Sequence, residues 1–482
     1  MREPMNRHAA AALALALTPM LGMLAAGAPA AGQASSEAAR VYALEARVAA
    51  LAAEAQRIED INAITRIGRA YGYYLDKGFW NEAADLFAED GTLEVGVDGV
   101  YRGQDRIRQA IIAYGGGGEE TGPGLPYGKY YRQMQLQPVV TISEDGQTAH
   151  ARWRQWSLLG QYEVFAAWGD AEMENVYVKD DGVWKIQAMR VYTNFVVPYQ
   201  GGWASLQPVE GDWMSDAAKA LPADAPPTTT YEPFPAVFVP PYHYDLETPA
   251  RVADLGGATP HSNQGEGDLG ALEAAADEIA ARVAIAASER AIENLQGQYG
   301  YYIDKGLWTE AAALFAESGT YEFGQSGVYV GRDRVRAAIG LMGPEGLEAG
   351  MLNNYPMLQP LITVADDNRT AKARWRSDVM LARNGRGRWG AGVYENEYVN
   401  DGGTWRIAKL HYYVTMWADY ERGWAQGAAL PMDGPSRTLP PDRPPTEVYG
   451  SLPEVYLPPY HYVHPVTGEP HPGPGLREEW EP

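Results

Sequence analysis

Hydrophobic positions recur at helical spacing around one stretch that the chain contains twice. The first copy spans Tyr71 to Phe87 (YGYYLDKGFWNEAADLF) and the second spans Tyr299 to Phe315 (YGYYIDKGLWTEAAALF). In the first copy, helical spacing before the Asp76-Lys77-Gly78 turn is kept by Ile61, Ile64, Ile67, Tyr71 and Tyr74. After the turn, the positions at i, i+3, i+4 and i+7 are Trp80, Ala83, Ala84 and Phe87. The pattern predicts a helix, a tight turn and a second helix in each copy.

Downstream of the first copy the pattern becomes strand-like. A short hairpin is predicted over Thr92 to Gly96 and Val100-Tyr101, and then a third helix that carries Ile107, Ile111 and Ile112. The Gly-rich stretch from Tyr114 to Gly128 is expected to be a flexible loop, and it lacks the Lys-Ser/Thr ending of a phosphate-binding loop. Four β-rich runs follow: Gln135 to Ile142, Thr148 to Leu159, Val164 to Lys179 and Val183 to Phe195. Helices followed by an antiparallel meander are typical of an α+β domain.

The segment before the first copy has the a/d spacing of a coiled coil. Steps of three and four residues separate Val41, Leu44, Val48, Leu51, Ala55 and Ile58. Similar spacing precedes the second copy at Leu272, Ala276, Ile279 and Val283. Three arrangements fit this pattern: the two helices pair with each other, they pair with another subunit, or each lies as an amphipathic helix on its own domain.

The repetition covers most of the chain. Asp304, Trp308, Glu322, Gly331 and Asp333 match Asp76, Trp80, Glu94, Gly103 and Asp105, and the sequence Ala-Arg-Trp-Arg occurs at both Ala151 and Ala373. Each copy ends in PPYHY, at Pro240 to Tyr244 and Pro458 to Tyr462. A period of about 220 residues indicates a duplicated domain and not a solenoid. We expect repeat one with its N-terminal helix and Pro-rich tail at 37–244, a linker at 245–270, repeat two with its tail at 271–463, and a C-terminal tail at 464–482.

The first residues have the composition of a secretory signal. Arg2 and Arg7 form a basic start, Ala9 to Ala26 an apolar stretch, and Ala28-Pro29-Ala30 a cleavage site with small residues. Residues 1–30 are therefore predicted to be a cleaved signal peptide, and the protein is expected to be exported, as a periplasmic or secreted protein. No later stretch is apolar enough to predict a membrane span after cleavage.

Composition narrows the classes of function. The formal net charge of −23 disfavours binding to nucleic acid and to anionic membranes, which are both bound through clustered Lys and Arg. The absence of cysteine excludes disulfides, a thiolate nucleophile and a thiolate metal site. Tyrosine and tryptophan, at 31 and 14 residues, far outnumber the 8 phenylalanines. Side chains with an apolar ring and a polar end are common in partly solvated pockets, and aromatic residues are also common in strands.

The repeated residues carry a resemblance to a known family. The run Tyr-x-x-x-Asp-x-Gly-x-Trp, a Gly-x-Asp helix start and a closing Gly-x-Trp-x-Ile strand at Gly182 to Ile186 and Gly403 to Ile407 resemble the SnoaL-like family. This family belongs to the nuclear-transport-factor-2-like superfamily, with scytalone dehydratase and ketosteroid isomerase among its relatives. The resemblance implies an α+β fold with two cone-shaped domains, each of three helices on a curved, mostly antiparallel sheet, preceded by an amphipathic helix. Each cone would enclose an apolar pocket.

The resemblance also points to candidate catalytic residues. In the dehydratase-like branch an aspartate at the end of the first helix lines the pocket, and here it corresponds to Asp76 and Asp304. The histidine that this branch carries ahead of the following strand is replaced by Gln133 and Tyr355. An aspartate in an apolar pocket has a raised pKa and can act as a general base. The alternative is a structural aspartate that accepts backbone N–H groups in the turn or caps the next helix.

The sequence also predicts aromatic and histidine side chains in the two pockets. The hydroxyl donors expected beside the aspartates are Tyr73, Tyr74, Tyr301 and Tyr302, with Trp80 and Trp308 in the pocket walls. The last strands differ, since His411 aligns with Arg190, and this predicts an Asp304–His411 pair that would make repeat two the active copy. A structural role for this strand histidine is the alternative.

Paired arginines and repeated acids lie on neighbouring predicted strands. Arg152 and Arg154, like Arg374 and Arg376, point to one face of their strand. They either clamp a substrate carboxylate or pair with acids, and Glu174 and Glu395 are either pocket acids or their partners. The histidines near the C-terminus lie in a Pro-rich stretch, so no metal site is predicted there. PPYHY is expected to be a strap on the domain surface or at a subunit interface.

These inferences predict an exported protein that binds a small hydrophobic or aromatic molecule without a cofactor. If it is an enzyme, it is expected to be a lyase of the dehydratase kind or an isomerase, with Asp304 as the base. The alternative is a non-catalytic ligand-binding or assembly protein of the cell envelope. Its expected partners are the small ligand and further copies of the chain, through the cones and the N-terminal helices.

Overall fold

The computed structural model describes residues 31–116, 124–205, 216–244, 269–426, 432, 434–473 and 475–476. The predicted signal peptide lies outside the described residues, as do 117–123 of the predicted loop and 245–268 of the predicted linker. Within the described residues, no helix has the length and apolar character needed to cross a membrane.

The chain forms two compact units. The smaller comprises residues 1–53 and 253–279, and the described part of it consists of the first turns of two long helices. The larger comprises Glu54–Val252 and Ala280–Pro482, so it contains the globular parts of both repeats. All contacts discussed below lie in this larger unit.

Both repeats follow the same order of elements. Those of repeat one are α1 (Ala31–Lys77), α2 (Trp80–Ala84), β1 (Phe87–Val95), β2 (Gly99–Arg102), α3 (Gln104–Gly116), β3 (Lys129–Ile142), β4 (Thr148–Gln161), β5 (Phe165–Asp180), β6 (Val183–Pro198), α4 (Gly202–Ser205) and α5 (Asp216–Ala220). Those of repeat two are α6 (Leu269–Asp304), α7 (Trp308–Ala313), β7 (Phe315–Phe323), β8 (Tyr329–Val330), α8 (Arg332–Ile339), the 3₁₀ turn η2 (Gly340–Met342), β9 (Leu352–Asn354), β10 (Leu358–Val364), β11 (Thr370–Arg383), β12 (Arg386–Asp401), β13 (Thr404–Asp419), α9 (Gly423–Gln426), β14 (Tyr456–Leu457) and β15 (Gly475–Leu476).

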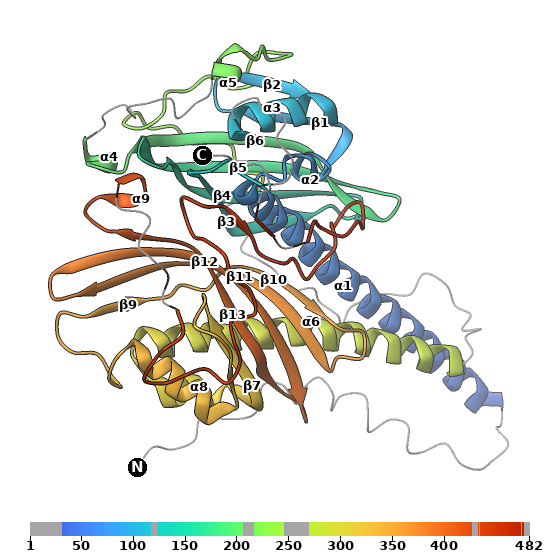
Figure 1. Ribbon diagram of the computed structural model, residues 1–482. Coiled ribbons are helices and arrows are strands. Elements are labelled where there is room, and N and C mark those ends of the chain that lie inside the picture. Colours follow the sequence, from blue (N-terminus) through green and yellow to red (C-terminus); the bar gives the residue numbers. More distant parts are fainter. Residues whose placement is uncertain are drawn as a thin grey trace. The chain divides into compact units, whose positions relative to one another are not determined.

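Each repeat has one mixed sheet. The strand order is β2-β1-β6-β5-β4-β3 in repeat one and β10-β11-β12-β13-β7-β8 in repeat two, where β9 also pairs with β11. Neighbouring strands are antiparallel except for the parallel pairs β1–β6 and β7–β13. Figure 1 shows α3 beside β1 and α8 beside β7, which these helices contact. The predicted α+β class, with a mostly antiparallel sheet in each repeat, is confirmed.

Three predicted boundaries were wrong. The heptad segment and the helix ending at the Asp76 turn are a single helix, α1, and not two elements. The second helix stops at Ala84, and Phe87 begins β1, where it pairs with Ile186 of β6. Helical spacing was misleading there because strand pairing and burial of Phe87 decide its conformation. The predicted loop is also shorter, because α3 continues from Tyr114 to Gly116.

The two long helices are linked to each other by polar side chains. Arg282 of α6 donates to Glu59 of α1 at 2.6 and 2.7 Å, and Asn62 of α1 donates to Glu289 at 2.7 Å. Of the three arrangements predicted for these helices, the contact between them within one chain is the one observed in the larger unit.

The Pro-rich tails run along the sheets as two equivalent segments, which we call strap one (226–244) and strap two (444–462). Residues of the two straps correspond one to one without a gap. Their inner sides are fixed alike: Thr228 donates to Glu94, and Thr446 donates to Glu322. In strap one Phe238 packs on Tyr192, and in strap two Tyr456 packs on Tyr413. The expectation that PPYHY belongs to a packed strap is confirmed.

Strap two also contributes to the core of the other repeat. The hydrophobic cluster that contains the core of repeat one includes Tyr449, Tyr456, Leu457 and Tyr462. The C-terminal tail also contacts repeat one, since His464 lies 2.9 Å from the backbone oxygen of Glu82. Repeat two therefore covers the end of α1 with its own strap.

Candidate functional site

Asp76 lies at the end of α1 in a cage of donors. The backbone N–H of Gln133 donates to its Oδ1 at 2.7 Å, and Arg376 of repeat two approaches with Nη1 at 3.1 Å and Nη2 at 2.7 Å. Arg132 Nη1 lies 3.8 Å from Oδ2. All three side chains in this ion-pair cluster are buried. The predicted role of Asp76 as a pocket base is therefore not supported: its carboxylate balances two buried arginines that would otherwise be costly to bury.

The cluster continues into repeat two and toward strap two. Arg132 Nε lies 2.6 Å from Asp378 Oδ1, and burial raises the pKa of Asp378. Lys77, next to Asp76, is buried and donates to the backbone oxygen of Tyr456 at 3.0 Å. Burial lowers the pKa of Lys77 to about 7, an effect that Asp76 opposes. Half of this cluster is thus supplied by each repeat.

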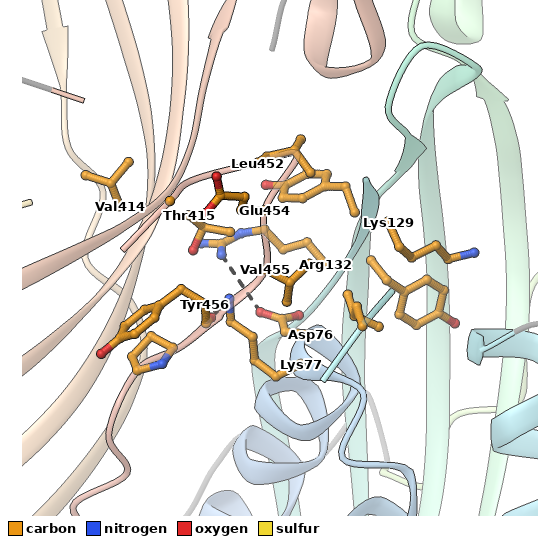
Figure 2. Close-up of a pocket in the computed structure, with 15 residues that line it drawn as sticks. Asp76, Lys77, Lys129, Arg132, Val414, Thr415, Leu452, Glu454, Val455 and Tyr456 are labelled. Carbon is orange, nitrogen blue, oxygen red and sulfur yellow. Dashed lines mark hydrogen bonds and ion pairs between the residues drawn. The ribbon is translucent and has the colours of Figure 1, made fainter. Parts of the chain in front are cut away.

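A cleft opens over this cluster, between β3 and strap two. It contains about 480 Å³ of empty space, including the part open to solvent, and its polar wall carries Asp76, Lys77 and Arg132. Figure 2 shows Arg132 reaching toward Asp76 and Lys77 extending toward the segment that carries Tyr456. Leu125, Leu452 and other apolar residues also line this cleft. A second cleft of about 360 Å³ lies between α1, α6 and β10.

Asp304 occupies the equivalent position in repeat two but has different neighbours. Its Oδ1 accepts the backbone N–H of Tyr355 at 2.6 Å, just as Asp76 accepts that of Gln133. No arginine or lysine lies within ion-pair distance of Asp304 among the described residues. Asp304 is half-buried, and burial raises its pKa although the Tyr355 N–H opposes this shift. Of the two equivalent aspartates, Asp304 is therefore the one that is not paired with an arginine among the described residues.

Buried tyrosines cluster in the core of repeat two. Tyr394 contacts Tyr299 and Tyr412, with ring centroids 6.4 and 4.5 Å apart. Burial raises the pKa of each of these tyrosines, so they stay protonated near neutral pH. Repeat one carries Met173 and Val191 where repeat two carries Tyr394 and Tyr412. The buried tyrosines of repeat two thus come from helix α6, which carries Tyr299, and from strands β12 and β13, which carry Tyr394 and Tyr412.

The aromatic residues assigned to the pockets are distributed unevenly. Trp80 and Trp308 are buried, as expected for walls, and Trp308 donates to the backbone oxygen of Gly343 at 3.0 Å. Tyr73 and Tyr74 are buried, but Tyr73 donates to Gln359 of repeat two and Tyr74 stacks on His464. Both therefore lie at the contact between the repeats.

Their counterparts in repeat two lie in different surroundings. Tyr302 is partly buried against the core of repeat two. Tyr301 is 74% exposed, so its assignment to the pocket was wrong. The donor groups sought beside Asp304 are consequently not the residues that immediately precede it on α6.

His411 does not pair with Asp304. It aligns with Arg190 as predicted, because Arg190 is paired with Glu94 across β1–β6 and His411 with Glu322 across β7–β13. Its Nδ1 lies 3.6 Å from Glu322 Oε2, and its ring stacks on Tyr413 at 3.8 Å. Both ring nitrogens are buried and have no hydrogen-bond partner in the part of the chain that the structure describes, and burial lowers the pKa of His411 to about 3. The predicted catalytic pair is corrected to a neutral, enclosed histidine beside the strap-binding Glu322.

Glu174 and Glu395 act as partners of the strand arginines and the straps. Glu174 pairs with Arg152 and contacts His243 Nδ1 at 2.8 Å. In repeat two Glu395 pairs with Arg374 and contacts His461 at 2.8 Å. Of the two roles predicted for these acids, the structure supports the structural one.

Sequence reasoning missed the histidines of PPYHY as the third members of these two triads. The signal that would have found them was present in the repetition, because Arg152, Glu174 and His243 recur in the same order as Arg374, Glu395 and His461. Among the described residues, no group of three or more His, Asp or Glu side chains is arranged to hold a metal ion.

Comparison with known proteins agrees with this duplicated architecture. A family profile described as the SnoaL-like domain matches residues 56–190 and again 284–411, together more than half of the chain. A search of curated proteins finds no match.

Solved structures similar to this chain each cover about one repeat. A putative scytalone dehydratase from Novosphingobium aromaticivorans is 20% identical, with 31% of this chain and 93% of that chain covered and a TM-score of 0.25. An NTF2-like protein with a cystatin-like fold from the same organism is 18% identical, with 30% and 87% covered and a TM-score of 0.23. A hexachlorocyclohexane dehydrochlorinase of type 2 is 17% identical, with 28% and 91% covered and a TM-score of 0.25.

Proposed function

Because the chain belongs to the SnoaL-like domain family in both of its repeats, we propose that repeat two carries out cofactor-independent acid–base chemistry on a small hydrophobic or aromatic carbonyl compound, and that repeat one is its scaffold. Asp304 is the proposed proton acceptor. The reaction class is that of a lyase or an isomerase.

One contrast carries this proposal. Asp76 and Asp304 occupy equivalent positions and accept equivalent backbone N–H groups, but only Asp76 is neutralised by arginines. The carboxylate oxygens of Asp76 already accept from Arg376 and from the Gln133 N–H, with Arg132 3.8 Å away, so they are occupied by the protein itself. Asp304 has no such arginine among the described residues, and its pKa is raised by burial, which brings it closer to the range in which a general base works near neutral pH.

The proposed chemistry needs a base and a donor to the developing oxyanion. The carboxylate takes a proton from the carbon next to the substrate carbonyl, and the electron pair moves onto the carbonyl oxygen. Protonated tyrosines such as Tyr394 and Tyr412 are suitable donors to that oxyanion. Return of the proton to a different carbon gives an isomerase, and loss of a leaving group from the neighbouring carbon gives a lyase.

The test compares the wild type with Asp304→Asn against hydrophobic ketones, phenols and polyketide-like compounds, following binding and turnover together. We expect Asp304→Asn to reduce turnover by about 10²-fold or more and to leave binding within a small factor, because the amide keeps the shape and loses the base. Glu310→Gln, an exposed substitution on the neighbouring α7, is the matched control. Turnover that survives in Asp304→Asn contradicts the proposal.

A non-catalytic ligand-binding or assembly protein is the second candidate. It is favoured by the position of the cleft lined by Asp76 and Lys77, which lies at the contact between the repeats and is not lined by Asp304. Binding without turnover in both the wild type and Asp304→Asn would support this candidate.

Export across a bacterial-type membrane is part of the proposal on the basis of residues 1–30 alone. Expression of the full chain in a bacterium, followed by fractionation and N-terminal sequencing, tests it. We expect a mature protein that begins shortly after Ala30, in the periplasm or the medium.

A further inference from the structure

Strap two packs on the end of a long helix, and strap one makes no equivalent contact among the described residues. The outer side of strap two packs on the end of α1: Tyr460 lies against Phe79 at 5.3 Å between ring centroids, and its hydroxyl donates to the backbone oxygen of Tyr73 at 3.3 Å. Lys77 Nζ donates to the backbone oxygen of Tyr456. An outward-facing strap and the end of a long helix therefore form a contact between repeats within the chain.

Strap one has the same inner contacts but an exposed outer side. Arg152 covers one face of Tyr242 at 3.8 Å, as Arg374 covers Tyr460 at 3.9 Å. However, Tyr242 is 44% exposed, and the apolar residues before it, Phe234, Val237 and Val239, are 46, 92 and 66% exposed. Several apolar side chains exposed close together mark an interaction surface more often than a single exposed residue does.

The receiving surface is also unoccupied in repeat two. Tyr301 at the end of α6 is 74% exposed, whereas its equivalent Tyr73 on α1 is 1% exposed under repeat two. Lys305, the equivalent of the buried Lys77, is exposed as well. Among the described residues, the outer side of strap one and the end of α6 are thus both exposed, and they are the equivalents of the two surfaces that meet in the internal contact.

We propose that strap one of one chain docks on the end of α6 of a second copy, so that the protein associates head to tail. The occupant is a second copy because the complementary surface is present on the same chain and because the equivalent surfaces, strap two and the end of α1, fit each other in the internal contact. Tyr242 would pack against the second copy near Tyr301, and Lys305 would donate to the backbone oxygen of Phe238, as Lys77 does to Tyr456.

Such an interface is heterologous, because the two surfaces that meet are different. A heterologous contact leaves one free strap and one free helix end on every assembly unless a ring closes. The expected assemblies are therefore a series of oligomers or a ring, and not a dimer that stops at two copies.

The test uses sedimentation velocity on the full-length mature protein and two charge variants, Val237→Glu on strap one and Tyr301→Glu on α6. Val448→Glu is the matched control, since Val448 is 80% exposed on strap two in a position that the internal contact does not use. We expect the wild type and Val448→Glu to associate with rising concentration, and each of the other variants to associate about tenfold more weakly or less. Circular dichroism and thermal unfolding verify that all variants are folded.

Mixing the two variants distinguishes head-to-tail docking from a symmetric interface. Val237→Glu keeps a functional helix end and Tyr301→Glu keeps a functional strap, so the mixture should form a 1:1 dimer that grows no further. A wild type that stays monomeric, a mixture that stays monomeric, or association that neither variant weakens overturns the proposal. The inference does not use Asp304, so these outcomes leave the acid–base proposal untouched.

Discussion

The ends of α1 and α6 have nearly the same sequence and very different surroundings. Asp76, Lys77 and Tyr73 are buried beneath strap two and Arg376, whereas Asp304, Lys305 and Tyr301 are partly or fully exposed. In both cases the aspartate accepts a backbone N–H from the same position of the following segment. The difference teaches that a repeated motif fixes the local geometry of a side chain, while its charge balance and access are set by what packs on it.

The largest effect should come from removing Arg376, because its ion pair with Asp76 is what distinguishes Asp76 from Asp304. Arg376→Met leaves the buried carboxylate of Asp76 with only the more distant Arg132 as a cation, and we expect a loss of about 3–5 kcal/mol in the free energy of unfolding. Arg154→Met is the matched control, because Arg154 pairs with Asp170 at a partly exposed site and should cost about 1 kcal/mol or less. Urea unfolding of both variants measures the difference. Equal losses in the two variants would contradict this account of Asp76.

The next comparison is between β6 and β13. His411 on β13 occupies the position that Arg190 occupies on β6. The pKa of His411 in the folded state, about 3, lies below its ordinary value because of burial, with a smaller effect from Lys409. The unfolded chain therefore takes up the proton first, so the stability that His411 contributes is present above about pH 6.5 and is lost as the pH falls toward 3.

The expected loss from this histidine is about 3 kcal/mol between pH 7 and pH 4. His411→Phe should flatten that part of the pH dependence of the urea midpoint relative to the wild type. His150→Phe, at an exposed histidine, should change it much less. Parallel pH profiles for the wild type and His411→Phe would show that His411 is not a buried neutral group.

Lys77 and Lys305 form the next comparison. Burial lowers the pKa of Lys77 to about 7, below its ordinary value, so the stability of the fold rises as the pH increases from 7 toward 10.5. Lys77→Met removes the cost of burying the ammonium, and at pH 7 we expect the variant to match the wild type or to exceed it by about 1 kcal/mol. The advantage should disappear as the pH rises. Lys305→Met, at the exposed counterpart, should show no such trend in the same thermal unfolding series.

The smallest expected effect is that of Asp304→Asn on stability. Because Asp304 balances no arginine, we expect a change within about 0.5 kcal/mol at pH 7. Asp76→Asn removes the charge between Arg376 and Arg132 and should cost about 3 kcal/mol or more. Chemical unfolding of the pair measures both values, and a large loss in Asp304→Asn would place this residue among the structural ones.

Much of the fold follows from the sequence because hydrophobic periodicity is local. Alternation located β4, β5 and β6 to within three residues of their ends, and it located the turns between the strands, but β3 begins at Lys129, six residues before the predicted start at Gln135. It failed at Phe87, where helical spacing continues into a strand that pairs with Ile186 far along the chain. It also failed at the junction before Glu59, because nothing in a heptad pattern indicates whether one helix continues into the next.

The candidate site was predictable in position more than in role. The motif identified Asp76 and Asp304 as equivalent residues, and their common backbone donors at Gln133 and Tyr355 agree with that equivalence. The pairing of Arg152 with Glu174 was one of two stated alternatives, since charges on neighbouring strands lie within reach of each other. The Asp304–His411 pair was wrong because the register of β13 on β7 places His411 opposite Glu322.

The sequence by itself determined that this chain is a duplicated α+β domain with a repeated aspartate and a repeated strap, because periodicity, turns and internal repetition are properties of local sequence. Only the tertiary structure decided that the two aspartates differ. Arg376 is far from Asp76 along the chain, and its contact depends on how the repeats pack. Charge balance and burial depend on distances in space, and two nearly identical motifs can therefore have different chemistry.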